Sequence, residues 1–134
     1  MFREIQNLKD RNESSVKDTP SLLAPYDAKG VHVGSYTKTN KLIAGLYMVT
    51  DILDKDEPIR TRLRILGSEV ISDIFSFPSS AQKLNNKIAE ILSFLDIASA
   101  VSIISHMNSS ILKREFLLLQ KSIEESTPNS FTFN

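Results

Sequence analysis

The stretch DKDEPIRTRLR, at residues 54–64, holds the side chains best suited to bind a charged group. Acidic residues come first, then Pro58, then arginines at positions 60, 62 and 64. Guanidinium groups bind phosphates and carboxylates through paired N–H donors, so these arginines are candidate anion ligands. The same pattern is also typical of a solvated turn that leads into a helix, because the helix dipole favours acids at a helix N-terminus. The sequence leaves both interpretations open.

The spacing of the arginines separates them on the helix that Pro58 is predicted to start. Arg60 and Arg64 fall on one flank of this helix and Arg62 on the other. Asp56 or Glu57 can pair with Arg60 across one turn, whereas Arg64 has no acidic residue three or four positions away. Arg64, and after it Arg60, are therefore predicted to remain available to an anion or a partner.

Residues for catalysis are scarce. His32 and His106 lie in no metal-binding spacing, the phosphate-loop and nucleophile-elbow motifs are absent, and no serine stands at a recognisable spacing from a histidine. A di-metal bundle needs inward carboxylates with Glu-x-x-His pairs, but the acids here fall outside the centres of the apolar stripes: Asp51, Glu69, Asp73, Glu90 and Asp96. We predict that the chain is not an enzyme and takes no metal, cofactor or small-molecule substrate.

Composition points to a cytoplasmic protein. Sixteen basic residues balance sixteen acidic ones, so no overall field attracts the chain to nucleic acid or to an anionic membrane. The absence of cysteine fits a reducing compartment. The N-terminus has no signal-peptide core, and no run approaches the roughly 20 apolar residues of a membrane span.

The elements that must position these residues are helices. From Asn40 onward the apolar residues recur at helical spacing, which predicts an all-α, antiparallel, up-down-up-down four-helix bundle over residues 40–127. The four stripes are Leu42, Leu46, Val49 and Leu53; Ile59, Leu63, Leu66, Val70, Ile74 and Phe77; Leu84, Ile88, Ile91, Leu95 and Ala98; and Leu112, Phe116, Leu119 and Ile123.

Capping residues and breakers mark the ends of these helices. We predict N-caps at Asn40, at Asp56, at Ser79 or Ser80, and at Asn108 or Ser109, with Pro78 ending the second helix. Residues 1–39 are predicted to form an irregular arm, with a short helix at 1–9 carried by Phe2, Ile5 and Leu8, and residues 128–134 a disordered tail. A helix as short as 1–9 needs a docking surface to be stable.

A second apolar edge on the later helices exceeds what a four-helix core requires. Ile43, Tyr47, Met48 and Ile52 also lie away from the stripe centre of the first helix. Such surplus indicates a buried interface, so we expect self-association or a permanent partner. The predicted interface residues are Phe94, Ile97, Val101, Ile111 and Leu118.

The segments KLIAGLYMVT, IRTRLRILGSEVI and KLNNKIAEIL, with an E-P loop between the first two, resemble a known group over roughly residues 40–126. This is the small bacterial four-helix-bundle family first met in ribosomal-RNA intervening sequences, which includes the accessory variability determinant of diversity-generating retroelements. The resemblance implies a ring-like homo-pentamer that binds a reverse transcriptase and its RNA through basic surfaces. By position it assigns this role to Arg62 and Arg64, before the small residue Gly67, and to Lys83 and Lys87.

Two functions therefore follow from the sequence. One is a non-catalytic oligomeric accessory subunit that presents its basic residues to a reverse transcriptase or its RNA. The members of that basic set are Arg60, Arg62, Arg64, Lys83 and Lys87. The alternative is a protein-only scaffold or adaptor that binds no nucleic acid, which the neutral net charge favours.

Overall fold

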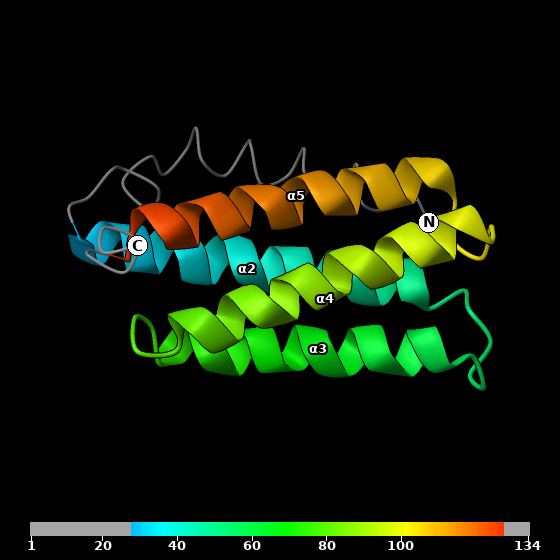
Figure 1. The fold of residues 1–134 in the computed structure, drawn as a ribbon, viewed down its shortest axis with the longest axis horizontal. Helices are drawn as coiled ribbons and strands as arrows, with labels where there is room; N and C mark the ends of the chain where they lie inside the picture. Colours follow the sequence, from blue (N-terminus) through cyan, green and yellow to red (C-terminus); the bar gives the residue numbers. More distant parts are fainter. Residues whose placement is uncertain (1–27, 128–134) are drawn as a thin grey trace.

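The structure, a computed structural model, describes residues 28–127 and consists of four helices joined by short loops (Figure 1). The helices are α2 (Ala28–Thr50), α3 (Pro58–Phe75), α4 (Ala81–Ala100) and α5 (His106–Glu125). No strand occurs in this part of the chain. The predicted all-α four-helix bundle is confirmed.

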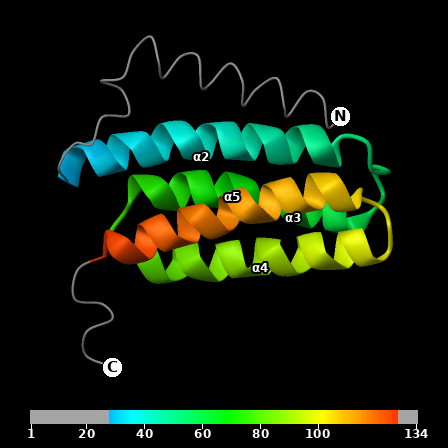
Figure 2. The ribbon, with the colours of Figure 1, turned by 90° about the horizontal axis from the view of Figure 1, so that it is seen from above.

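The contacts between α2 and α3 pair the early part of each helix with the late part of the other. Tyr36, in the first half of α2, stacks on Phe75 at the end of α3, with ring centroids 5.1 Å apart. Tyr47, near the end of α2, instead contacts Arg64 nearer the start of α3. Successive helices therefore run antiparallel, and Figure 2 shows the same alternation from above. α2 and α4 each pack against both α3 and α5, so the four helices form a square in cross-section.

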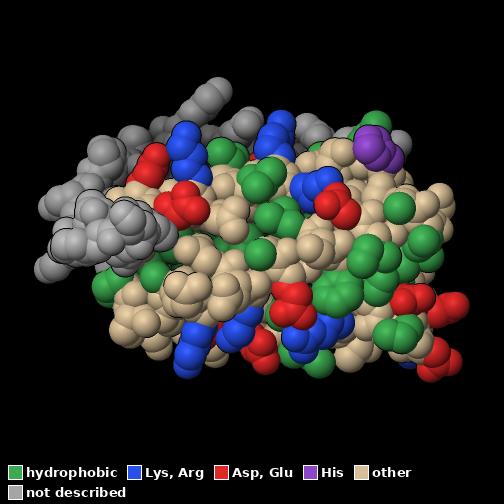
Figure 3. All heavy atoms as spheres, in the orientation of Figure 1, with side chains coloured by type: hydrophobic (Ala, Val, Ile, Leu, Met, Phe, Trp, Pro, Cys, Tyr) green, Lys and Arg blue, Asp and Glu red, His purple; other side chains and the backbone are tan. Residues whose placement is uncertain are grey.

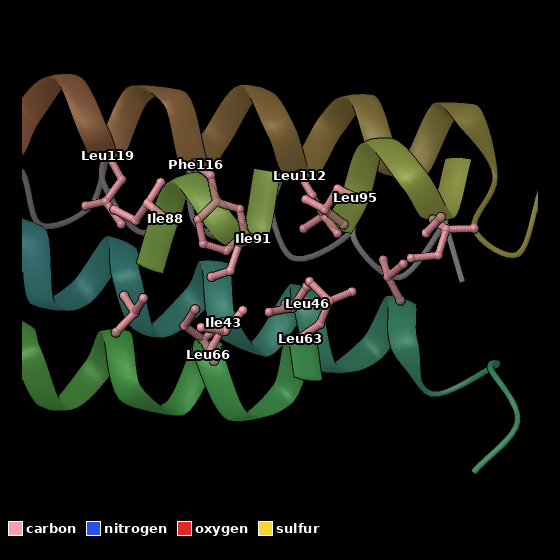
Figure 4. Packing of buried hydrophobic residues seen from close by; sticks show 14 of the residues in the cluster. Ile43, Leu46, Leu63, Leu66, Ile88, Ile91, Leu95, Leu112, Phe116 and Leu119 are labelled. Carbon is pink, nitrogen blue, oxygen red and sulfur yellow. The ribbon is translucent and has the colours of Figure 1, made fainter. Parts of the chain in front are cut away.

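The core fills the space between the four apolar stripes. Figure 4 shows Leu46 and Leu63 facing Leu95 and Leu112 across the bundle, with Phe116 in the neighbouring layer. Most predicted stripe residues are buried, whereas Leu42, Ile59 and Phe77 are only half-buried at the margin. Two residues outside the predicted stripes, Ile43 and Ile104, are also buried in this core. The helical period thus identified the core, although not its edges.

The first helix begins well before its predicted start. α2 starts at Ala28, so the prediction that Asn40 caps this helix is wrong, and residues 28–39 belong to the bundle rather than to an irregular arm. Gly30 and Gly34 each cost a helix about 1 kcal/mol relative to alanine. The Tyr36–Phe75 stacking and the burial of Thr39 show how packing against the bundle extends the helix beyond what local propensity indicates.

The other predictions about the terminal segments concern residues outside the described part of the chain. These are the remainder of the arm at 1–27, the short helix at 1–9 and the tail at 128–134.

The starts of α3 and α5 also differ from prediction by one to a few residues. Glu57, not Asp56, caps α3, and its carboxylate accepts the N–H of Ile59 at 3.0 Å. Because Pro58 occupies the first helical position, the capping position falls on the residue immediately before it. At α5 the cap is Ser105, whose hydroxyl oxygen accepts the N–H of Asn108 at 3.1 Å.

Asn108 and Ser109, the predicted caps of the last helix, lie inside the first turn of α5 and are buried. The hydroxyl of Ser109 donates to the carbonyl of Leu95 on α4 at 3.1 Å, so a polar residue ties the two helices together instead of starting one. Ser80 does precede α4, as predicted, but its hydroxyl donates to the carbonyl of Asp73 rather than capping the helix.

The end of α4 is a reversal built around a left-handed residue. Ser102 has φ 65°, and its N–H donates to the carbonyl of Ser99 at 3.0 Å. The N–H of Ile103 donates back to Ala98 at 2.9 Å, which completes the hydrogen-bond pattern of a Schellman motif. The reversal directs Ile104 into the core and leaves Val101, the C-cap residue of α4, exposed.

Two helical glycines give a matched test of how closely the helices approach. A Cβ at Gly67 on α3 would lie 3.0 Å from Cδ2 of Leu46 and 3.4 Å from Cγ2 of Ile43, both on α2. A Cβ at Gly45 would meet only Cδ2 of Leu112, at 3.8 Å. We expect Gly45→Ala to raise the free energy of unfolding in urea by about 1 kcal/mol through helix propensity.

Gly67→Ala should lose most of that gain, because the crowded Leu46 and Ile43 side chains must shift to admit the methyl group. An equal gain for both substitutions would mean that α2 and α3 do not approach each other so closely at Gly67.

Candidate functional site

Arg60 and Arg64 of α3 converge on the C-terminal end of α2. Nε of Arg60 donates to the carbonyl of Thr50 at 3.2 Å. Nε of Arg64 donates to the hydroxyl of Thr50 at 2.9 Å, and its Nη2 donates to the carbonyl of Tyr47 at 2.9 Å. Both guanidinium groups also lie within 4 Å of a carboxylate oxygen of Asp51, at 3.9 and 3.7 Å. We call this group of five residues the arginine cap of α2.

The arginine cap provides the positive charge that the last turn of α2 lacks. The last carbonyls of a helix have no partner within it and carry partial negative charge, so cations stabilise this end. α2 has no basic residue in its last turn, and the two arginines come from the neighbouring helix instead. The Arg64 guanidinium also lies 4.6 Å from the centre of the Tyr47 ring, in cation–π geometry.

The arginine cap changes the interpretation of the opening stretch. Arg60 forms an ion pair with Asp51 across the loop, whereas the sequence predicted a pair with Asp56 or Glu57. Arg64, predicted to remain available to a ligand, has its donors directed at α2 and its side chain only 21% exposed. The sequence could not show this, because Tyr47, Thr50 and Asp51 lie one helix earlier and the relevant contacts depend on how α2 and α3 pack.

The remaining predicted basic residues lie along the junction of α3 and α4. Arg62 donates to one carboxylate oxygen of Glu90 through both Nε and Nη2, at 3.1 and 2.8 Å. Nζ of Lys87 donates to Asp73 at 2.8 Å and lies 3.7 Å from Glu69. These pairs neutralise much of the local positive charge, and a phosphate group would have to compete with them.

Lys83 lies near the start of α4 and, like Arg62, is exposed. The structure thus does not bring the five predicted residues together as one open cluster: Arg60 and Arg64 face α2, whereas Arg62 and Lys87 face carboxylates between α3 and α4.

The hydrogen bond to Asp73 raises the pKa of Lys87 above the ordinary lysine value of 10.5, and this effect outweighs the opposite effect of desolvation. A lysine whose pKa is raised on folding stabilises the fold fully below its unfolded pKa, and this stabilisation is lost as pH rises through the folded pKa. We expect Lys87→Met to lower the free energy of unfolding by about 1 kcal/mol at pH 7.

The measurement is urea unfolding of the wild type and of Lys87→Met at neutral pH and above pH 10.5. The difference between the two proteins should shrink as pH rises, because the wild type loses the contribution of the charged lysine. A difference that is constant or grows with pH would show that the ion pair with Asp73 does not stabilise the fold.

An apolar patch lies on the C-terminal half of α4. Phe94, Ile97 and Val101 follow Glu90 at steps of four, three and four residues, so they continue the flank that Glu90 shares with Arg62 of α3. Ile97 is 47% exposed and Val101 60%, whereas Phe94 is half-buried against the core. We call these three residues the α4 patch. Figure 3 shows hydrophobic side chains gathered toward this end of the face that α4 occupies.

The other two predicted interface residues, Ile111 and Leu118, do not join the α4 patch. Lys113 pairs with Asp96 of α4, which fixes the side of α5 that faces α4. Ile111 and Leu118 lie about 140–160° around the helix from Lys113, on the side toward α2. The structure therefore divides the predicted interface between opposite faces of the bundle, one at the α3–α4 junction and one at the α2–α5 junction.

Elements of catalytic chemistry are few in the part of the chain that the structure describes. Ser99 and His106 come within 3.5 Å of each other across the α4–α5 loop, a contact that their sequence spacing did not suggest. Both side chains lie at the surface, and the distance is at the limit of a hydrogen bond. Among the side chains that the structure describes, no cluster of three potential ligands from histidine and acidic residues could hold a metal ion. None of the four helices is long and apolar enough to cross a bilayer.

No protein-family model, curated protein or solved structure matches this chain. The resemblance to the intervening-sequence family therefore remains a prediction from the quoted segments.

Proposed function

We propose that this chain is a non-catalytic scaffold that binds a second copy of itself through the α4 patch. The observation that carries the proposal is the exposure of Ile97 and Val101 beside Phe94 on one helical stripe. A stripe with this spacing can pack against the same stripe of another α4, as in a helix pair that buries its apolar edge.

The charges around the α4 patch favour a second copy as the occupant. On one flank Arg62 pairs with Glu90, and on the other Lys113 pairs with Asp96. Each flank is therefore close to neutral, and the whole chain has a formal net charge of zero. Two identical faces meet without like-charge repulsion, which would oppose a self-contact between faces of one sign.

The predicted accessory function, with a reverse transcriptase or its RNA as partner, rests on the family resemblance. The internal partners of Arg60, Arg62, Arg64 and Lys87 give it less support than the α4 patch gives the scaffold. Both functions require a homo-oligomer, but only the accessory function includes binding to RNA. Separate measurements of self-association and of RNA binding therefore distinguish them.

The first measurement is sedimentation velocity on the full chain. The wild type is expected to sediment as a species larger than its 15.0 kDa monomer at high micromolar concentration. Ile97→Glu with Val101→Glu should shift it to the monomer. Leu117→Glu is the matched control, since Leu117 is 50% exposed on α5 and lies outside the α4 patch. A monomeric wild type, or equal loss of association in the control, would overturn the proposal.

The second measurement tests RNA binding at two salt concentrations. The scaffold function predicts weak RNA binding that is equal in the wild type and in Arg62→Ala with Lys83→Ala. Tight binding by the wild type that falls steeply with salt and weakens in the double variant would support the accessory subunit instead.

A further inference from the structure

An apolar stripe on α5 remains after the core and the α4 patch are assigned. Met107, Ile111 and Leu118 lie at steps of four and seven residues, which places them within about 40° of one another on the helix. Met107 and Leu118 are each 56% exposed, and Ile111 is half-buried against the core. The stripe extends over roughly 16 Å of helix and faces the α2 side of the bundle.

The chain contains a segment of matching chemistry and size before α2. Residues 1–9, MFREIQNLK, carry Phe2, Ile5 and Leu8 at helical spacing. As a helix these nine residues would be roughly 14 Å long, which is close to the length of the α5 stripe. A helix this short is marginally stable alone in water, so its apolar edge favours docking on a complementary surface.

The connection between the two is long enough to reach. Residues 10–27 join this segment to Ala28, and about 18 residues span up to roughly 60 Å when extended. α2 has 23 residues and is therefore about 34 Å long, so the segment can reach any point along α5. Tethering by a linker of this kind gives an effective concentration that approaches the millimolar range, above that of a second chain at micromolar concentration.

We propose that the α5 stripe of Met107, Ile111 and Leu118 is the intramolecular docking surface for residues 1–9. The docked segment covers the α2–α5 face, and the α4 patch on the opposite face stays available to a second copy. The proposal is independent of self-association, because the two surfaces have no residue in common.

The absence of cysteine makes a disulfide cross-linking experiment direct. The full chain carrying Ile5→Cys and Leu118→Cys is oxidised under mild conditions at low micromolar concentration. The matched control carries Ile5→Cys and Ile65→Cys, since Ile65 is also an exposed apolar residue, at 42%, but lies on α3, outside both the α5 stripe and the α4 patch. Non-reducing gels and peptide mass spectrometry separate cross-links within one chain from those between chains.

We expect the Ile5–Leu118 pair to cross-link within one chain at least about tenfold faster than the Ile5–Ile65 pair. Adding Phe2→Glu and Leu8→Glu should abolish that difference, since the charges remove the apolar edge of the segment. Equal rates for the two pairs would show that residues 1–9 are linked to the bundle but do not dock on the α5 stripe, and this would overturn the proposal. Cross-links mainly between chains would also overturn it, by assigning the α5 stripe to a second copy.

Discussion

Leu95→Asp should abolish the cooperative thermal unfolding of this protein, with a loss of more than about 4 kcal/mol. Leu95 is fully buried on α4, and Figure 4 shows it in the core layer with Leu112. A carboxylate at this position would be desolvated among the apolar side chains of the core. It can avoid the desolvation cost by binding a proton or by unfolding the helices around it. The change also removes the leucine packing between α4 and α5.

The measurement is circular dichroism at 222 nm during heating, with Leu117→Asp as the control for introducing the same charge at an exposed leucine. The control should unfold within a few degrees of the wild type. Leu63→Asp should behave like Leu95→Asp, because Leu63 is equally buried on α3. A cooperative transition near the wild-type temperature in either core variant would contradict the assignment of the core.

The core residues could be predicted from the sequence because the pattern that identifies them lies within each helix. Which residues of α3, α4 and α5 face inward depends on the 3.6-residue period, and each helix displays that period without reference to the others. The start of α2 depends instead on a contact between Tyr36 and Phe75, which are far apart in the sequence. Propensity and two glycines suggested an irregular arm there, and packing overrides them in the structure.

The candidate site was less predictable than the core. The sequence correctly placed the three arginines on one helix. Their spacing also correctly showed that no acidic residue lies one turn from Arg64 on α3. The partners that occupy Arg64 are carbonyls and side chains of the preceding helix, and no spacing rule within one helix can show them. The excess of apolar residues on α4 and α5 was likewise visible in the sequence. That these residues lie on opposite faces of the bundle becomes clear only from how α4 and α5 pack.

Arg64→Ala should lower the free energy of unfolding by about 2 kcal/mol, whereas Arg62→Ala should change it by less than about 0.5 kcal/mol. Removing Arg64 leaves the Tyr47 carbonyl and the Thr50 hydroxyl without its donors and removes the cation from the Tyr47 ring. Arg62 is 45% exposed, and solvent screens its pair with Glu90.

Arg64→Lys is the informative third variant, measured with the other two by urea unfolding at neutral pH. Lysine retains the charge but presents a single nitrogen, which cannot reproduce the planar donor geometry of the guanidinium group toward both Tyr47 and Thr50. It should therefore recover less than half of the stability lost in Arg64→Ala. Full recovery would show that charge near Asp51 suffices. If Arg64→Ala left stability unchanged and weakened binding to RNA, Arg64 would act as an anion ligand, and the opening stretch would be a binding site rather than the cap of a neighbouring helix.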